Sequence, residues 1–143
     1  MSAFENAKHF FAACETSLGW EGCKEFVSEG ATFSAQCEPL VDIHSVREYS
    51  DWMAVLGTET APGATYDLHS ASFCPETRMA LFFATFHVTH TGAGGPVPPT
   101  HRKASTHYVY ALKMNEEDRV ESMTKIWNAP WAMRELGWTS EAG

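Results

Sequence analysis

Basic residues are scarce in this sequence. Ten Lys and Arg stand against eighteen Asp and Glu in 143 residues, so the formal net charge is −8 at pH 7 with His neutral. Nucleic acids bind basic surfaces because Lys and Arg replace the counterions of the phosphates, and an anionic membrane surface repels an acidic chain. Nucleic acids and membrane lipids are therefore not expected as partners.

Long apolar runs are also missing. No run reaches the roughly 18 residues that a membrane-spanning helix needs. The first residues, MSAFENAKHFFAAC, carry charges among their apolar side chains and lack the h-region of a signal peptide. A cytoplasmic protein is the expectation that follows.

Paired cysteines are the third absence. The four cysteines stand at 14, 23, 37 and 74, without a C-x-x-C pair, which argues against a zinc ribbon or a thioredoxin-type site. We expect four free thiols in a reducing compartment, no metal and no cofactor.

Aromatic residues, in contrast, are frequent: nine Phe, five Trp and four Tyr. Such side chains bring large apolar area of fixed shape, which suits both cores and pocket walls. A chain of this length fits one domain, spanning residues 1–143. Hydrophobic residues make up 44% and charged residues 20%, as in ordinary globular proteins.

The spacing of apolar residues predicts helices first and strands after them. Ser2 and Glu5 form a capping box for the first helix, and Asp42 or Ser45 caps the third. The expected helices are 3–18, 20–28 and about 45–56, with a short one after Pro130, and the expected strands are 31–36, 64–74, 78–91, 103–114 and 119–128. Sequential strands joined by turns pair antiparallel, so an α+β fold is predicted, with helices on one face of a curved antiparallel sheet.

Alternation along the strands divides their side chains between two faces. The face with the larger aromatics, Phe82, Phe86, Tyr108 and Tyr110, is assigned to the helix side and to a cavity. If residues 91–102 form a wide hairpin loop, Thr91 lies near Lys103. That register places Phe86 opposite Tyr108, Ala84 opposite Tyr110 and His87 opposite His107. The two histidines would then pair on the back face, as a metal site or pH-sensitive contact across a dimer, or as unrelated residues.

The order of elements, the hairpin YVYALKMNEEDRVESMTKIWN and the ending W-x-M-R-E-L-G-W together resemble a known superfamily. The chain is similar to nuclear transport factor 2-like proteins, in the branch of SnoaL-like polyketide cyclases and ketosteroid isomerase. The resemblance covers nearly the whole chain. It implies a cone-shaped α+β roll, in which three helices and a bent sheet close an apolar pocket, and a homodimer through the back of the sheet.

The resemblance also locates positions where relatives carry chemistry. It puts Met123, Lys125 and Trp127 inward, and it puts Tyr110 at the oxyanion-hole Asp of ketosteroid isomerase. Phe11 then stands at that enzyme's catalytic Tyr and Ala35 at its general-base Asp. Asn128 stands where many relatives carry an Asp, and an amide takes no proton. Steroid isomerisation is therefore not expected, because base and donor are both absent from those positions.

Four side chains remain as candidates for chemistry. Lys125 would be a cation in an apolar cavity that polarises a carbonyl, or else a solvated residue at the rim. Tyr108 and Tyr110 would donate hydrogen bonds to a bound oxygen, or else pack in the core. His90, beside the TGAGGPVPPT loop, would be an acid or base at the mouth, or else an exposed residue at a strand end. The loop itself is a lid or a structured connection.

A larger set is expected to contact the substrate, with plain core packing as the alternative. These residues are Trp20, Gln36, Trp52, Phe86, Met123, Trp127, Asn128 and Cys14.

Three functions are compatible with these patterns. The first is a cofactor-independent enzyme of SnoaL-like type, which cyclises or isomerises an apolar carbonyl-bearing substrate by acid/base chemistry. The second is a binding protein that holds an apolar small molecule without converting it. The third is a dimeric interaction module. The aromatic residues predicted inside favour the first two.

Overall fold

The computed structural model describes residues 2–139. Two of its helices begin at serines whose side chains accept hydrogen bonds from backbone amides of the first turn. Ser2 Oγ accepts from the amide of Glu5 at 3.1 Å and Ser45 Oγ from that of Glu48 at 3.1 Å, which confirms both predicted caps. The helical elements are α1 (Ala3–Glu15), α2 (Gly19–Cys23), η1 (Lys24–Phe26), η2 (Glu38–Leu40), α3 (Val46–Val55), η3 (Leu56–Thr60) and α4 (Ala129–Glu135).

The second helix is shorter than predicted, because the chain enters the sheet early. Strand β1 begins at Val27 and ends at Ala35, whereas the sequence suggested a helix to 28 and a strand from 31. Val27 is β-branched and favours a strand. Gly30 does not end the helix; it lies inside β1 with φ +77°, at the irregularity between Val27 and Thr32.

The sheet has five strands in the order β1-β5-β4-β3-β2. The others are β2 (Thr65–Cys74), β3 (Met79–Thr89), β4 (Lys103–Met114) and β5 (Val120–Trp127). The last four pair antiparallel as predicted, but β1 pairs parallel with β5, so the sheet is mixed. A parallel pair needs a long connection, and the chain between β1 and β5 provides one. The predicted α+β class is confirmed.

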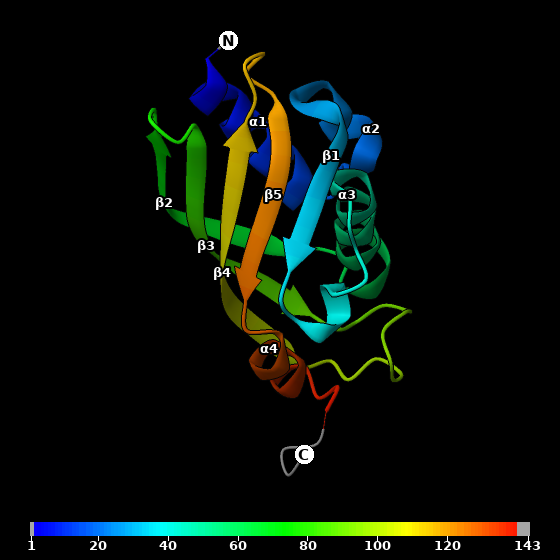
Figure 1. Cartoon of the computed structure of the whole chain (residues 1–143). Coiled ribbons are helices and arrows are strands. Elements are labelled where there is room, and N and C mark those ends of the chain that lie inside the picture. The colour runs from blue at the N-terminus through cyan, green and yellow to red at the C-terminus, as the bar shows by residue number, and fades with distance from the viewer. Residues whose placement is uncertain (1, 140–143) are drawn as a thin grey trace.

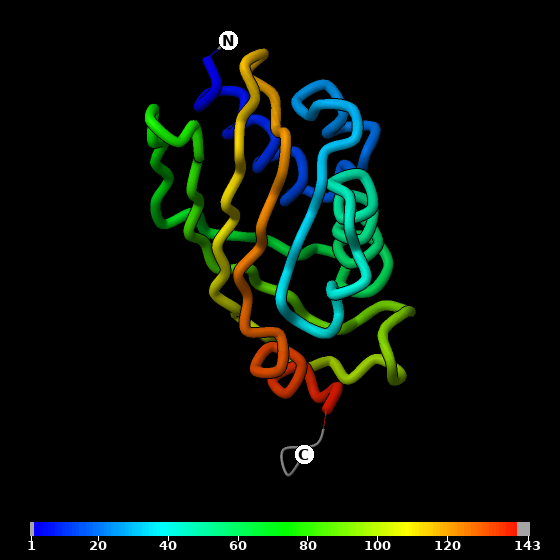
Figure 2. Tube along the Cα trace, in the orientation of Figure 1, coloured from blue at the N-terminus to red at the C-terminus, as the bar shows by residue number. Residues whose placement is uncertain are grey.

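Helices α1, α2 and α3 lie against one face of the sheet and leave the other face uncovered (Figure 1). Strands β2 and β3 cross behind β5 and β1, so the sheet curls around the helical side (Figure 2). Helix α4 lies beyond the end of β5. Within residues 2–139, no helix is long and apolar enough to cross a membrane.

The register between β3 and β4 differs from the predicted one by two residues. Thr89, not Thr91, pairs with Lys103, so Tyr108 lies opposite Ala84 and Tyr110 opposite Phe82. The reason is that the chain stays paired beyond the strand ends: the amide of His90 donates to Arg102 O at 3.1 Å. The loop between them is therefore shorter than 91–102.

The predicted division of faces is confirmed. Phe82, Phe86, Tyr108 and Tyr110 are buried under the helices, and Phe11 of α1 stacks on Phe82 with ring centroids 4.7 Å apart. The other face carries large apolar residues that are exposed, namely Leu81 and Phe83 of β3 and Ile126 of β5. Their neighbours along each strand point to the helix side and are mostly buried.

Candidate functional site

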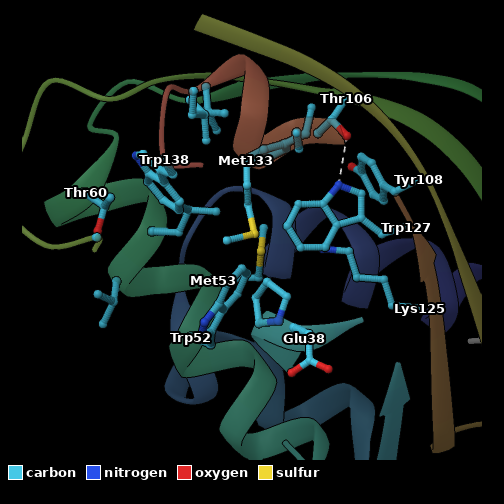
Figure 3. A pocket seen from close by; sticks show the side chains of 18 of the residues that line it. Glu38, Trp52, Met53, Thr60, Thr106, Tyr108, Lys125, Trp127, Met133 and Trp138 are labelled. Carbon is cyan, nitrogen blue, oxygen red and sulfur yellow. Dashed lines mark hydrogen bonds between the residues drawn. The ribbon is translucent and has the colours of Figure 1, made fainter. Parts of the chain in front are cut away.

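A cavity of about 470 Å³ lies between the inner face of the sheet, α3 and α4 (Figure 3). A volume of this order suits a small organic molecule. Its wall is mostly apolar, with aromatic rings from α3, β3, β4 and β5 and from Trp138 after α4. The lining residues that matter for the site are Glu15, Trp52, Phe86, Tyr108, Lys125 and Trp127.

Lys125 lies two residues before the end of β5 and points inward, as the resemblance implied. Its exposed fraction is only 6%, and its Nζ donates to the hydroxyl of Tyr49 at 2.9 Å. Five aromatic rings have centroids 4.6 to 6.0 Å from Nζ, and they belong to Tyr49, Trp52, Tyr108, Tyr110 and Trp127. These rings replace the water that a surface lysine would have around it.

Glu15, the last residue of α1, is the second charged group at this end of the cavity. Its side chain is buried, and its two carboxylate oxygens accept hydrogen bonds from the hydroxyls of Tyr108 and Tyr110. Sequence reasoning missed this residue. The signal was available, because Glu15 follows Phe11 by four residues and therefore lies on the apolar stripe of the helix.

Hydroxyl groups connect the two charges. The hydroxyls of Tyr49 and Tyr110 are 2.7 Å apart. A lysine ammonium only donates and an ionised carboxylate only accepts, so the hydrogen bonds run from Lys125 to Tyr49, to Tyr110 and to Glu15. We call these residues, with Tyr108, the Glu15–Lys125 network. Every member has a partner, as buried polar groups require.

Burial dominates the acid–base properties of the network. It raises the pKa of Glu15 above its ordinary value, against the opposing effects of the Lys125 charge and the tyrosine hydroxyls. Burial lowers the pKa of Lys125 to about 8, although the Glu15 charge acts in the other direction. It also raises the pKa of Tyr49 and of Tyr110. Burial therefore favours the neutral form of both groups, and a fraction of Lys125 is neutral near neutral pH.

The structure brings together some of the predicted residues and separates others. Lys125, Tyr108, Trp52, Phe86 and Trp127 line the cavity, and Tyr110 lies just behind its wall in the network. The indole of Trp127 donates to Thr106 Oγ1 at 2.8 Å, which fixes its ring (Figure 3).

Five predicted contact residues do not line this cavity. Cys14 and Met123 are core residues, and Trp20 packs partly buried against the core beside Arg47. Gln36 is exposed on a shallow surface depression, together with Asn128. Asn128 instead caps α4, where its Oδ1 accepts from the amide of Trp131 at 3.3 Å.

His90 is buried rather than exposed at the strand end, and it does not line the cavity. Its Nδ1 accepts from the indole of Trp138 at 2.8 Å, which places the ring proton on Nε2, 3.2 Å from Gly94 O. Both nitrogens are thus occupied. Trp138 and the neighbouring Gly95 line the cavity, so His90 fastens the glycine-rich loop to the C-terminal segment over the cavity.

The predicted pair of His87 and His107 does not form. With the corrected register His87 lies opposite Ser105, and its ring bonds Ser105 Oγ at 2.9 Å and Asp67 at 2.8 Å. His107 lies opposite Thr85 instead. In the part of the chain that the structure describes, no group of three or more His, Cys, Asp or Glu side chains is placed to hold a metal.

No protein-family model matches the sequence, and no curated protein sequence matches it. Solved structures do match. A SnoaL-like protein provisionally named a polyketide cyclase, from a Jannaschia species, is 14% identical with a TM-score of 0.76, over 96% of this chain and 93% of that one. AclR from Streptomyces galilaeus, provisionally named a hydroxylase, is 16% identical with a TM-score of 0.74, over 97% and 87%. A nuclear transport factor 2-like protein from Burkholderia thailandensis is 8% identical with a TM-score of 0.73, over 97% and 99%.

The chain therefore has the nuclear transport factor 2-like fold, in the form found in SnoaL-like proteins. The resemblance predicted from the sequence is confirmed at the level of the fold. Sequence identities this low carry the fold and not the activity, because one fold hosts many functions.

The lowered pKa of Lys125 predicts how stability depends on pH. Between the folded value of about 8 and the ordinary value of 10.5, the unfolded chain binds more protons than the folded one. The free energy of unfolding should therefore rise from about pH 8 to about pH 10, by at most roughly 1.4 kcal/mol per pH unit. Above about pH 10 the raised pKa of the buried tyrosines acts the other way.

Denaturant titrations across this range measure the effect. Lys125→Met should abolish the rise, because the variant has no amine to titrate there. Lys103→Met, at an exposed position, should keep it. An identical rise in all three proteins would show that Lys125 is not its source.

His90→Phe should loosen the loop over the cavity. The new ring is also aromatic but cannot make the hydrogen bonds to Trp138 and Gly94, each worth about 1 kcal/mol. The amides of the non-proline residues in the loop should then exchange with deuterium roughly thirtyfold faster, since about 2 kcal/mol is lost and 1.4 kcal/mol corresponds to a factor of ten. His107→Phe, the same change on the exposed back face, is the control and should leave the exchange unchanged.

Proposed function

We propose that this protein is a cofactor-independent enzyme of SnoaL-like type, which cyclises or isomerises an apolar carbonyl-bearing molecule held in the cavity. The observation that carries the proposal is the Glu15–Lys125 network at the end of an otherwise apolar cavity. Burying two opposite charges costs several kcal/mol for each ion, and a packed apolar interior would be as stable. Charged groups kept beside a cavity are therefore candidates for chemistry.

The two charged groups suit opposite halves of a carbon-acid reaction. The carboxylate of Glu15, with its pKa raised by burial, can take a proton from the carbon next to a carbonyl. The ammonium of Lys125 can stabilise the negative charge that then develops on the carbonyl oxygen. Tyr108 lines the same end and keeps Glu15 in place. The hydroxyls between the charges offer a path by which the proton returns.

Size and polarity of the cavity indicate the class of substrate. Trp52, Trp127 and Phe86 present flat apolar surface, which suits fused or aromatic rings. Among the described residues, the charged side chains that line the cavity are Glu15 and Lys125 of the network and Glu38. A molecule with an apolar body and one or two carbonyl groups fits this cavity, because its body contacts the aromatic wall and its carbonyl groups reach the network.

A binding protein without turnover is the second candidate. The observation that favours it is that both oxygens of Glu15 already accept hydrogen bonds from tyrosines. Hydrogen bonds to the ionised carboxylate lower the pKa of Glu15 and so make it a weaker base. The same cavity would then retain an apolar carbonyl compound, with Lys125 as the hydrogen-bond donor.

Deuterium uptake by β-tetralone, a bicyclic ketone, separates the two candidates. An enzyme should speed the exchange of the protons next to the carbonyl in deuterium oxide, followed by proton NMR. Glu15→Gln should slow this exchange by roughly 100-fold or more, because the amide accepts no proton. Lys125→Met should slow it to a similar extent, since the enolate loses its counter-charge.

Glu38→Gln is the matched control, since Glu38 also lines the cavity but is exposed. It should leave the rate unchanged. Binding of the ketone without accelerated exchange would support the binding protein, and equal rates in all variants would contradict both roles assigned to the network.

We also propose that two copies associate through the uncovered face of the sheet. Phe83 and Leu81 of β3 and Ile126 of β5 are exposed there, with Ile126 at 62%. Large apolar side chains gathered on one face favour a protein partner over water. Helices α1, α2 and α3 lie against the opposite face of the sheet, so this face stays accessible (Figure 1).

Phe83→Asp should weaken this association at least tenfold, because a charge replaces an apolar contact at the centre of the interface. Sedimentation velocity over a range of concentrations measures the effect. Leu18→Asp, at an exposed apolar residue before α2, should leave it unchanged. A wild-type chain that sediments as a monomer at all concentrations would rule the association out.

A further inference from the structure

We propose that Lys125 is a covalent nucleophile, whose Nζ condenses with a carbonyl carbon of the substrate and releases water. The inference rests on the proposed function, because it takes the cavity and the carbonyl-bearing substrate from there. It goes further in assigning a bond to Lys125 rather than a hydrogen bond. It also narrows the substrate class to ketones that an amine can attack, above all β-diketones.

The position of Lys125 carries the inference. Among residues 2–139 it is the only Lys, Arg or His that lines the cavity, and its side chain lies beside Trp127 (Figure 3). No carboxylate of the described residues forms an ion pair with it within 4.0 Å. A lysine that serves only to balance a buried carboxylate would contact it directly. Lys125 instead reaches Glu15 through the hydroxyls of Tyr49 and Tyr110.

A nucleophilic amine must be neutral and dry, and the surroundings of Lys125 meet both needs. The rings of Trp127 and Tyr49 lie 4.6 and 5.1 Å from Nζ and keep water away. Within the described part of the chain its Nζ makes one hydrogen bond, to Tyr49, and the other positions of the nitrogen have no partner. Burial lowers the pKa of Lys125 to about 8, so roughly one molecule in ten carries the free amine at pH 7. An ordinary lysine has fewer than about one in a thousand.

The chemistry balances with groups that are present. Nζ attacks the carbonyl carbon, a C–N bond forms, and one proton passes from nitrogen to the carbonyl oxygen. The C–O bond then breaks and the oxygen leaves as water. Its second proton comes from the carbon between the two carbonyls, carried by the carboxylate of Glu15, which accepts and then donates it. The product of a β-diketone is an enaminone, and no oxidant or reductant takes part.

Benzoylacetone, an aromatic β-diketone, tests the proposal on the intact protein. The wild-type chain should gain the mass of the probe less one water, with the modification on Lys125 by peptide mass spectrometry and the absorption band of an enaminone. The rate should rise with pH through about 8, as the ammonium loses its proton. At pH 7 Lys125 should react more than roughly 100-fold faster than the exposed Lys103, because a lysine with a pKa of about 8 carries the free amine far more often than an ordinary lysine.

Lys125→Arg and Lys125→Met should both form no adduct at this position, although arginine keeps the charge and the hydrogen bond. Thermal melting checks that each variant is folded. Quenching of tryptophan fluorescence by the probe would show that it binds. Quenching without an adduct would contradict the role of Lys125 as a nucleophile and would remain compatible with the proposed function. Neither quenching nor adduct would contradict both. Equal labelling of Lys125 and Lys103 would overturn the nucleophile, because the cavity would then give no activation.

Discussion

The Glu15–Lys125 network is the constraint on which the rest of the site depends. Two charges without a direct ion pair lie in an apolar interior, and only tyrosine hydroxyls satisfy them. The network requires the end of α1, the middle of α3 and the facing parts of β4 and β5 to meet within hydrogen-bond distance. The network therefore ties α1 and α3 to the inner face of the sheet, in addition to the apolar burial between them.

The cavity gains its chemical character from the same arrangement. Aromatic rings shape the wall and keep water out, which strengthens every electrostatic interaction inside. Burial moves the pKa of Glu15 upward and that of Lys125 downward, so both approach neutrality. A protein that only needed stability would gain little from this, whereas a site that moves protons or forms a C–N bond needs it.

The fold is shared with SnoaL-like proteins, but two positions that the resemblance links to chemistry carry apolar residues here. Phe11 and Ala35 occupy positions where the resemblance to ketosteroid isomerase implies a tyrosine and an aspartate, and both are buried core residues. The carboxylate of this chain lies one helical turn after Phe11 instead. The buried carboxylate of this chain thus lies at a position that the resemblance did not single out, and fold similarity alone does not carry an activity.

The sequence by itself determined the element order, the cap at Ser2 and the faces of β3 and β4, because these follow from local periodicity and hydrogen bonding. For the third helix it offered Asp42 or Ser45 as the cap, and the inward direction of Lys125 came from the family resemblance, because the pattern of the last strand fits either face. Tertiary structure decided the rest. The parallel pairing of β1 and the two-residue shift beside His90 depend on where distant segments meet. Glu15 joined the site for the same reason: its partners, Tyr108 and Tyr110, are more than 90 residues away along the chain. Local patterns contain no information about such contacts, since they arise only when the helices pack on the curved sheet.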